Sequence, residues 1–83
     1  MITIRYFGFL KEALGISEEQ IDAQCCKNTA ELLDYLRNRN TQWVDVLSDA
    51  NIFKLVVNLN VIHDVTPISS GDEVGILPPV TGG

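Results

Sequence analysis

The sequence predicts a single α+β domain in which a mixed sheet carries one principal helix. Three observations support this fold class: short alternating segments near both ends of the chain, one amphipathic helical pattern between them, and a length of 83 residues, which allows one core. Hydrophobic residues make up 46% of the chain and charged residues 20%, as in ordinary globular domains. We expect the domain to span residues 1–77 and an extended C-terminal tail to span residues 78–83.

Two segments have the spacing of helices, FLKEALG and NTAELLDYLRNRN. The first ends at Gly15, which suits a helix cap. The second opens with Asn28 three residues before Glu31, the spacing of a capping box, although Thr29 could be the cap instead. We expect this principal helix to begin near residue 30 and a further helical turn to form around Trp43.

Alternating or β-branched segments predict the strands. In MITIRYFG the apolar positions 2, 4 and 6 share one face, which leaves Phe7 on the other. EEQIDAQC predicts a second strand with Ile21, Ala23 and Cys25 on one face, and IFKLVVN, VI and EVGIL predict three more. The prolines at positions 78 and 79 end the last strand, because they lack the N–H groups that a sheet needs.

This order of strands around one principal helix is the pattern of a β-grasp fold. In that fold the first and last strands run side by side in parallel. Phe7 and Leu77 would then lie together at one end of the sheet, on the face away from the helix. Single apolar residues are normal on protein surfaces, but two neighbours would form a patch suited to an interface.

Charge and hydropathy exclude several classes of partner. The net charge of −5 would repel a phosphate backbone, so we expect no nucleic-acid binding. Neither a secretory signal nor a run of about 18 apolar residues is present, which predicts no membrane association and a cytoplasmic protein. Cys25 and Cys26 are adjacent, which disfavours a disulfide between them, and the lone His63 makes no metal site. We assign these three residues no role.

The chain ends in PPVTGG, and a terminal glycine pair has a chance probability of roughly 0.5% if glycine is about 7% of residues. A frayed end is the simplest interpretation. Alternatively, two residues without Cβ atoms would let a partner enzyme reach the carboxylate of Gly83 through a narrow channel. The prolines would project the tail, and the next two side chains would hold it in register. The residues expected to enter the channel are Pro78, Pro79, Val80, Thr81 and Gly82.

A carboxylate resists nucleophiles, so the carboxyl group of Gly83 would first need activation. Adenylation by ATP makes a mixed anhydride, which sulfide or a persulfide can attack to give a thiocarboxylate. This chemistry requires no catalytic side chain in the chain itself, and the sequence offers no convincing catalytic cluster or metal-ligand spacing. We therefore expect a chain that is not an enzyme on its own and binds no cofactor.

The segment GDEVGILPPVTGG resembles the C-terminal signature of the small subunit of molybdopterin synthase, a ubiquitin-like sulfur carrier. The strand ending at Phe7, the Val57-Asn58 pair, the turn at Trp43 and the chain length are also similar, so the resemblance covers most of the chain. The sequence departs from the family pattern at three places, and one of them is Ser69-Ser70, which precedes Gly71 where an acidic residue often appears. Leu77 stands where an aromatic residue is common, and Gly75 stands where alanine is common.

The resemblance implies that a ubiquitin-activating-like adenylyltransferase adenylates Gly83 and that the resulting thiocarboxylate enters the active site of the large synthase subunit. Two carriers in succession would deliver sulfur to cyclic pyranopterin monophosphate, which forms molybdopterin in molybdenum cofactor biosynthesis. The resemblance places the catalytic residues in the large subunit and implies a heterotetramer of two small and two large subunits. Phe7, Val61 and Leu77 match the family's apolar docking positions.

Three other functions would be compatible with the same tail. The chain could carry sulfur into another pathway, such as that of the thiamine thiazole. It could be a ubiquitin-like protein modifier whose C-terminus forms an isopeptide bond with lysines of target proteins. It could also be a plain interaction domain with an incidental glycine end. The PPVTGG ending favours the molybdopterin branch.

Overall fold

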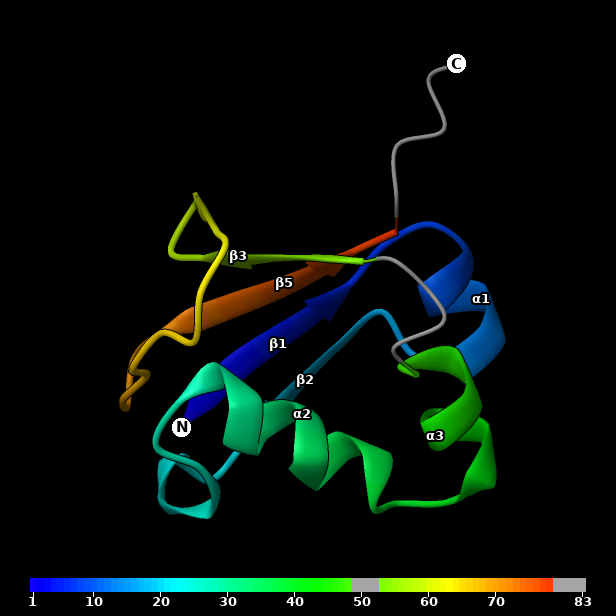
Figure 1. Cartoon of the computed structure of the whole chain (residues 1–83), viewed down its shortest axis with the longest axis horizontal. Coiled ribbons are helices and arrows are strands. Elements are labelled where there is room, and N and C mark those ends of the chain that lie inside the picture. Colours follow the sequence, from blue (N-terminus) through cyan, green and yellow to red (C-terminus); the bar gives the residue numbers. More distant parts are fainter. Residues whose placement is uncertain (49–52, 79–83) are drawn as a thin grey trace.

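The computed structural model describes residues 1–48 and 53–78, and five strands in this part of the chain form one mixed sheet. The strands are β1 (Ile2–Tyr6), β2 (Glu18–Ile21), β3 (Lys54–Val57), β4 (Asn60–Ile62) and β5 (Glu73–Leu77). Their order is β2-β1-β5-β3-β4 (Figure 1), and β1 and β5 run parallel to each other inside the sheet. The pairs β1–β2, β3–β5 and β3–β4 are antiparallel.

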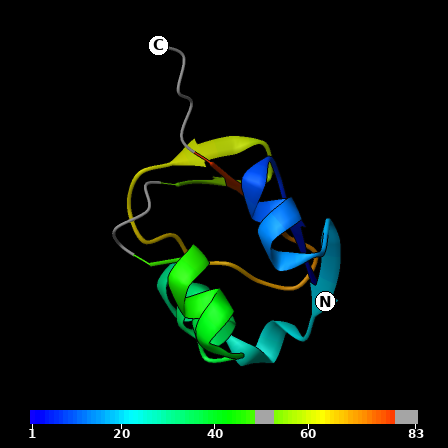
Figure 2. The same cartoon turned by 90° about the vertical axis from the view of Figure 1, so that its right-hand side faces the viewer.

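Helices cover one face of this sheet. They are α1 (Phe9–Leu14), the 3-10 turn η1 (Ala23–Cys25), α2 (Thr29–Arg37) and α3 (Thr41–Val46). Figures 1 and 2 show α2 and α3 on the same side of the sheet, and no helix of the described residues lies on the opposite side. We call that opposite side the helix-free face. None of the helices in residues 1–48 and 53–78 has the length and apolar character needed to cross a membrane.

The principal helix α2 is capped by Asn28, which decides between the two caps that the sequence allowed. The side-chain oxygen of Asn28 accepts a hydrogen bond from the Glu31 backbone N–H at 2.9 Å. Glu31 in turn accepts one from the Lys27 N–H at 2.9 Å. Thr29 is buried, and its hydroxyl oxygen accepts from the Thr66 N–H at 3.0 Å. The helix therefore begins at Thr29, one residue before the expected start.

The prediction for the second strand is wrong in its last part, because β2 ends at Ile21. Asp22 follows, and its carboxylate accepts a hydrogen bond from the Gln24 N–H at 2.9 Å. This short-range bond supplies the backbone with a partner outside the sheet, so the chain turns into η1. Ala23 and Cys25 are therefore residues of a 3-10 turn, although their spacing continues the alternation of the strand.

The core lies between the sheet and α2, α3 and α1, and it confirms the alternation expected for the first and last strands. Tyr6 contributes the largest fully buried side chain, and its ring meets that of Trp43 edge to face, with centroids 5.6 Å apart and planes at 78°. The aliphatic residues that are completely buried are Ile2, Ile4, Leu10, Leu32, Leu36, Leu47, Val74 and Ile76.

A polar network ties β2 to the segment between α2 and α3. The Tyr6 hydroxyl donates to Glu19 at 2.6 Å, and the Arg39 guanidinium donates two hydrogen bonds to the same carboxylate at 2.6 and 2.8 Å. Arg39 also lies over the Trp43 ring, 4.5 Å from its centroid. Burial alone would raise the pKa of Glu19, but the hydrogen bonds from Arg39 and Tyr6 outweigh it and lower that pKa.

Candidate functional site

The helix-free face carries the two residues that the sequence placed together at one end of the sheet. Phe7 is 41% exposed and Leu77 is half-buried, and both line one hollow of about 180 Å³. Phe7 N–H donates to the carbonyl of Ile76 at 3.3 Å, which ties the end of β1 to the end of β5. We call this cavity the outer hollow, and its lining consists of Arg5, Phe7, Val56, Leu59, Glu73, Gly75 and Leu77.

The third predicted docking residue, Val61, belongs to the same face but lies outside the hollow. Val61 pairs with Val56, and Val56 pairs with Gly75 in the next strand. Residues directly opposite each other in a sheet point to the same side, so Val61 lies beside the hollow on the edge strand β4. Its side chain is 50% exposed. Strand register thus places Phe7, Val61 and Leu77 on one continuous surface.

Gly75 forms the floor of the outer hollow. A Cβ atom at this position would lie 3.2 Å from Cε2 of Phe7 and 3.8 Å from Cβ of Val56. The Phe7 ring therefore packs directly over the glycine backbone, in space that a side chain would occupy. Gly75 and Leu77, two of the places at which the sequence departs from the resembled pattern, line this hollow, and Ser69-Ser70 lie outside its lining.

The charged side chains at the border of the outer hollow pair with one another. The Arg5 guanidinium lies 3.1 Å from a carboxylate oxygen of Glu18 and 2.8 Å from one of Glu73. All three side chains are at least one-third exposed, so these ion pairs add little stability.

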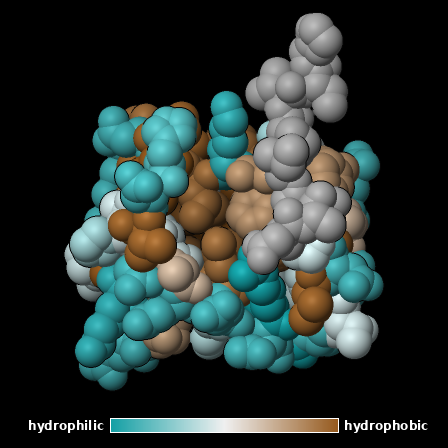
Figure 3. All heavy atoms as spheres, viewed as in Figure 1, coloured by the Kyte–Doolittle hydropathy of each residue, from teal (hydrophilic) through white to brown (hydrophobic). Residues whose placement is uncertain are grey.

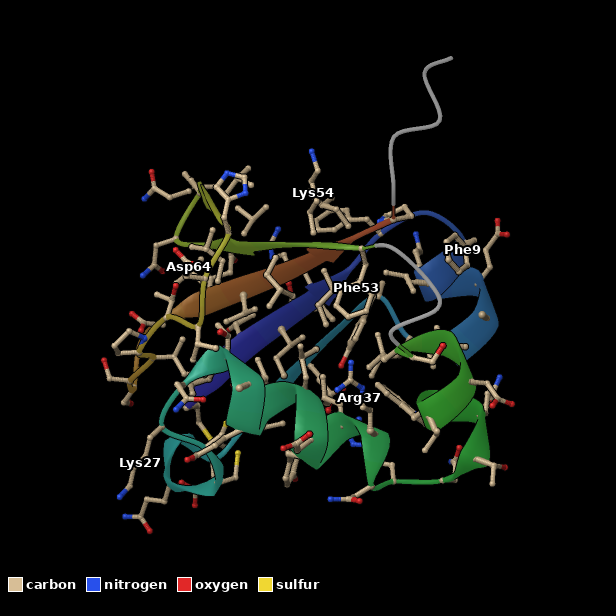
Figure 4. The ribbon with its side chains drawn as sticks, viewed as in Figure 1. Phe9, Lys27, Arg37, Phe53, Lys54 and Asp64 are labelled. Carbon is tan, nitrogen blue, oxygen red and sulfur yellow. The ribbon has the colours of Figure 1, made fainter. Side chains whose placement is uncertain are left out.

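Figure 4 shows Lys54 pointing away from the helices and its neighbour Phe53 pointing toward them, as strand alternation requires.

Gly8 and Pro78 pack against each other at the end of β5, where the described part of the chain stops. Gly8 follows β1 with φ +60°, and a Cβ atom there would lie 2.6 Å from Cγ of Pro78. The Pro78 ring therefore rests on the glycine backbone beside Phe7. Sequence reasoning missed Gly8, although a glycine between a strand and a helix was a usable signal. The remaining predicted tail residues, Pro79, Val80, Thr81, Gly82 and Gly83, lie outside the described residues.

A tight hairpin between β3 and β4 forms the far wall of the outer hollow. Its two central residues, Asn58 and Leu59, have φ values of 49° and 70°. Asn58 suits this conformation and donates to Asp72 at 3.0 Å; hydrogen bonds from Asn58 and from the Ser69 N–H hold the pKa of Asp72 below its ordinary value. Leu59 is 86% exposed. Sequence reasoning gave Leu59 no role, because the turn lacks the glycine that marks most such hairpins.

A second hollow, of about 340 Å³, lies between α2 and the β3–β4 strands. Figure 3 shows apolar side chains gathered there, at the centre of the face that it displays. His63 and Asp64 border it, yet the described part of the chain contains no cluster of three His, Cys, Asp or Glu residues that could hold a metal. It shares no lining residue with the outer hollow.

Cys26 is a poor nucleophile in this setting. Cys26 is buried, and burial together with a contact to the sulfur of Cys25, 3.1 Å away, raises the pKa of the Cys26 thiol to about 12. A thiol with that pKa stays protonated near neutral pH. Cys26 is therefore not suited to carry a persulfide or to act as a nucleophile.

A parallel β1–β5 pair, flanking antiparallel strands and one principal helix across a single face define a ubiquitin-like β-grasp domain. Solved structures share this fold. Small archaeal modifier protein 1 from Methanosarcina acetivorans has a TM-score of 0.75 at 22% identity, with 99% of this chain and 95% of that chain covered. The Haloferax volcanii protein of the same name has a TM-score of 0.74 at 20% identity, with 99% and 98% covered. At these identities the likeness concerns the fold alone.

The sequence pattern of the ThiS family matches residues 4–83, and the chain belongs to this family. Molybdopterin synthase sulfur carrier subunits from Escherichia coli K12 and Haemophilus influenzae are 28% and 25% identical to it, over 83 and 84 residues, with 100% of each chain covered. A solved complex of subunits 1 and 2 of molybdopterin-converting factor from Helicobacter pylori 26695 contains a similar chain. That chain has a TM-score of 0.71 at 25% identity, with 99% of this chain and 97% of that chain covered.

Proposed function

We propose that this chain is the sulfur carrier subunit of a molybdopterin synthase. The observation that carries the proposal is the position of the apolar pair Phe7 and Leu77 directly beside Pro78, from which the tail leaves. A partner that binds the helix-free face would receive the tail at the same end of the sheet. The full-length similarity to two sulfur carrier subunits supports this function over the thiamine and modifier alternatives.

The tail carries the chemistry. A carboxylate oxygen of Gly83 attacks the α-phosphorus of ATP on a ubiquitin-activating-like enzyme, and pyrophosphate leaves. The sulfur of sulfide then attacks the acyl carbon of the adenylate, and AMP leaves with the electron pair of the broken C–O bond, which gives the thiocarboxylate directly. A persulfide donor instead gives an acyl disulfide at the same carbon. A thiol then attacks the donor-side sulfur, so that the thiocarboxylate leaves and a disulfide forms with the donor. The thiocarboxylate sulfur then bonds to a carbon of cyclic pyranopterin monophosphate. Water breaks the C–S bond to the Gly83 acyl group, which leaves the sulfur on the pterin and restores the carboxylate. Two carriers act in succession, because molybdopterin carries two dithiolene sulfurs.

The folded domain positions the tail for sulfur transfer. Phe7, Val61 and Leu77 dock on the large subunit, which contributes the catalytic residues, and two small and two large subunits form a heterotetramer. The similar chain in the two-subunit Helicobacter pylori complex supports such a pairing. Pro78, packed on Gly8, directs the tail, and Pro79, Val80, Thr81 and Gly82 occupy the channel that leads to the active site. The free thiols of Cys25 and Cys26 support a cytoplasmic location.

Reconstitution with purified components tests this function. The chain is incubated with the activating enzyme, ATP and a sulfide donor, and then with the large subunit and cyclic pyranopterin monophosphate. We expect molybdopterin from the full chain and none from a variant lacking Gly83. The full chain and the variant should have the same Tm. Molybdopterin formation by the shortened variant would exclude the proposed role of Gly83. Transfer of the activated tail to protein lysines would instead identify a modifier.

A further inference from the structure

Leu59 has two features that do not stabilise the isolated domain. Its φ of 70° lies in the left-handed region, where a leucine side chain is strained. The same side chain is 86% exposed, so a large apolar surface faces water. Asparagine or glycine would satisfy the turn without either cost. A strained and exposed residue is therefore a candidate for binding, because a partner could offset both costs.

The position of Leu59 indicates what it could bind. It lines the outer hollow together with Phe7, Gly75 and Leu77, and the Phe7 ring packs over Gly75. The hollow measures about 180 Å³. A cavity of roughly 150 Å³ holds one benzene ring, so the outer hollow has room for one large apolar side chain.

The hairpin holds Leu59 in place. Asn58 N–H donates to the Glu73 carbonyl at 2.9 Å, and Glu73 N–H donates to the Asn58 side chain at 3.0 Å. Asp72 accepts from the Asn58 amide at 3.0 Å and from the Ser69 N–H at 2.8 Å. These bonds fix the turn against the start of β5, so ordering Leu59 on binding would cost little entropy.

We propose that Leu59 is an additional anchor for the large synthase subunit, and that one aromatic or long aliphatic side chain of that subunit inserts between Leu59 and Leu77. The inference rests on the proposed function and adds a residue that the predicted set of Phe7, Val61 and Leu77 omits. The occupant follows from continuity, because Phe7 and Leu77 form two walls of the hollow and also belong to the proposed interface. A side chain seated there would bury Leu59, which is otherwise exposed.

Titration calorimetry with the purified large subunit tests the anchor. Leu59→Gly removes the side chain and relieves the backbone strain, so we expect the Kd to rise at least about tenfold while the Tm stays equal or rises. Leu59→Asn also fits the left-handed region and should weaken binding similarly. Gly75→Ala places a methyl group on the floor of the hollow and should also raise the Kd. Val65→Ala is the control, because Val65 is 64% exposed and lies outside the hollow, and its Kd should not change.

Each alternative outcome has a defined meaning. Wild-type affinity in Leu59→Gly and Leu59→Asn, together with weaker binding by Phe7→Ala, would overturn the anchor and leave the proposed function standing. Absence of binding between the wild-type chain and the large subunit would overturn both. Self-association of the wild-type chain that disappears in Leu59→Gly would assign the hollow to a second copy and also overturn the anchor.

Discussion

Gly8 is required for two separate reasons, its backbone conformation and the packing of Pro78. Its φ of +60° disfavours any residue with a Cβ atom, and Pro78 fills the space that this atom would need. Gly15 shares only the first constraint, because its φ is +71° but nothing lies within 4 Å of its Cβ position. Their backbone conformations also differ, because ψ is −137° at Gly8 and 21° at Gly15. The difference between the two glycines therefore reports the packing of Pro78 together with the more restricted backbone conformation of Gly8.

We expect Gly15→Ala to lower the free energy of unfolding by about 1 kcal/mol, the cost of a left-handed alanine. Gly8→Ala should lower it by roughly 1–3 kcal/mol more, because the new methyl group displaces the Pro78 ring. Urea denaturation of both variants measures the difference. Equal losses would mean that Pro78 does not pack on Gly8. Gly8→Ala should also reduce sulfur transfer, since the tail would leave the domain in another direction.

At the scale of elements, the Glu19–Arg39–Tyr6 network joins β2 to the segment after α2 and predicts a dependence of stability on pH. Its hydrogen bonds lower the pKa of Glu19 below the ordinary value of 4.5. A carboxyl group with a depressed pKa in the folded state contributes stability above its unfolded pKa and loses it as the pH falls through the folded value. The contribution of Glu19 should therefore be complete above about pH 5 and decline below pH 4.5.

Glu19→Gln tests this dependence. The variant should be less stable than wild type at pH 7, because Arg39 loses its ionised partner, and the difference should shrink as the pH falls below 4.5. Thermal unfolding between pH 3 and pH 7 measures it. Glu18→Gln is the control, since Glu18 pairs with Arg5 at an exposed site and should matter little at any pH. A constant gap between Glu19→Gln and wild type would refute the linkage.

The elements also show what could be predicted from the sequence. Strands β1 and β5 and helix α2 were predictable, because their apolar spacing is regular over five or more residues. The end of β2 was not, because the Asp22 side chain forms a local hydrogen bond that no apolar pattern records. The positions of Phe7 and Leu77 followed from strand parity and the parallel pairing expected for the fold. The Gly8–Pro78 contact and the Glu19–Arg39 pair join residues far apart in the sequence, and only the folded chain brings them together.

At the scale of the whole molecule, the proposed docking residues Phe7 and Leu77 lie at the same end of the sheet as Pro78, so the proposed function predicts that binding and delivery are geometrically coupled. The chain offers a pair of phenylalanines to test this. Phe7 is 41% exposed on the helix-free face, and Phe9 is 44% exposed on α1 (Figure 4). Similar exposure and identical chemistry make Phe9 a control for nonspecific effects of losing an aromatic ring.

Phe7→Ala should raise the Kd for the large subunit at least about tenfold and slow sulfur transfer, because it removes a wall of the outer hollow. Phe9→Ala should leave both quantities near wild type. Calorimetry and single-turnover assays with a thiocarboxylated chain measure them. Equal effects of the two substitutions would show that the partner binds a different surface.

The intact mass of the chain, isolated from its native cells under denaturing conditions, tests the central claim most directly. A sulfur carrier should show a fraction in which sulfur replaces one oxygen, and fragmentation should place the exchange at Gly83. Covalent adducts with other proteins through Gly83 would contradict the account in favour of a modifier. A chain that remains unmodified in cells, and also after incubation with the activating enzyme, ATP and a sulfur donor, would contradict sulfur carriage altogether.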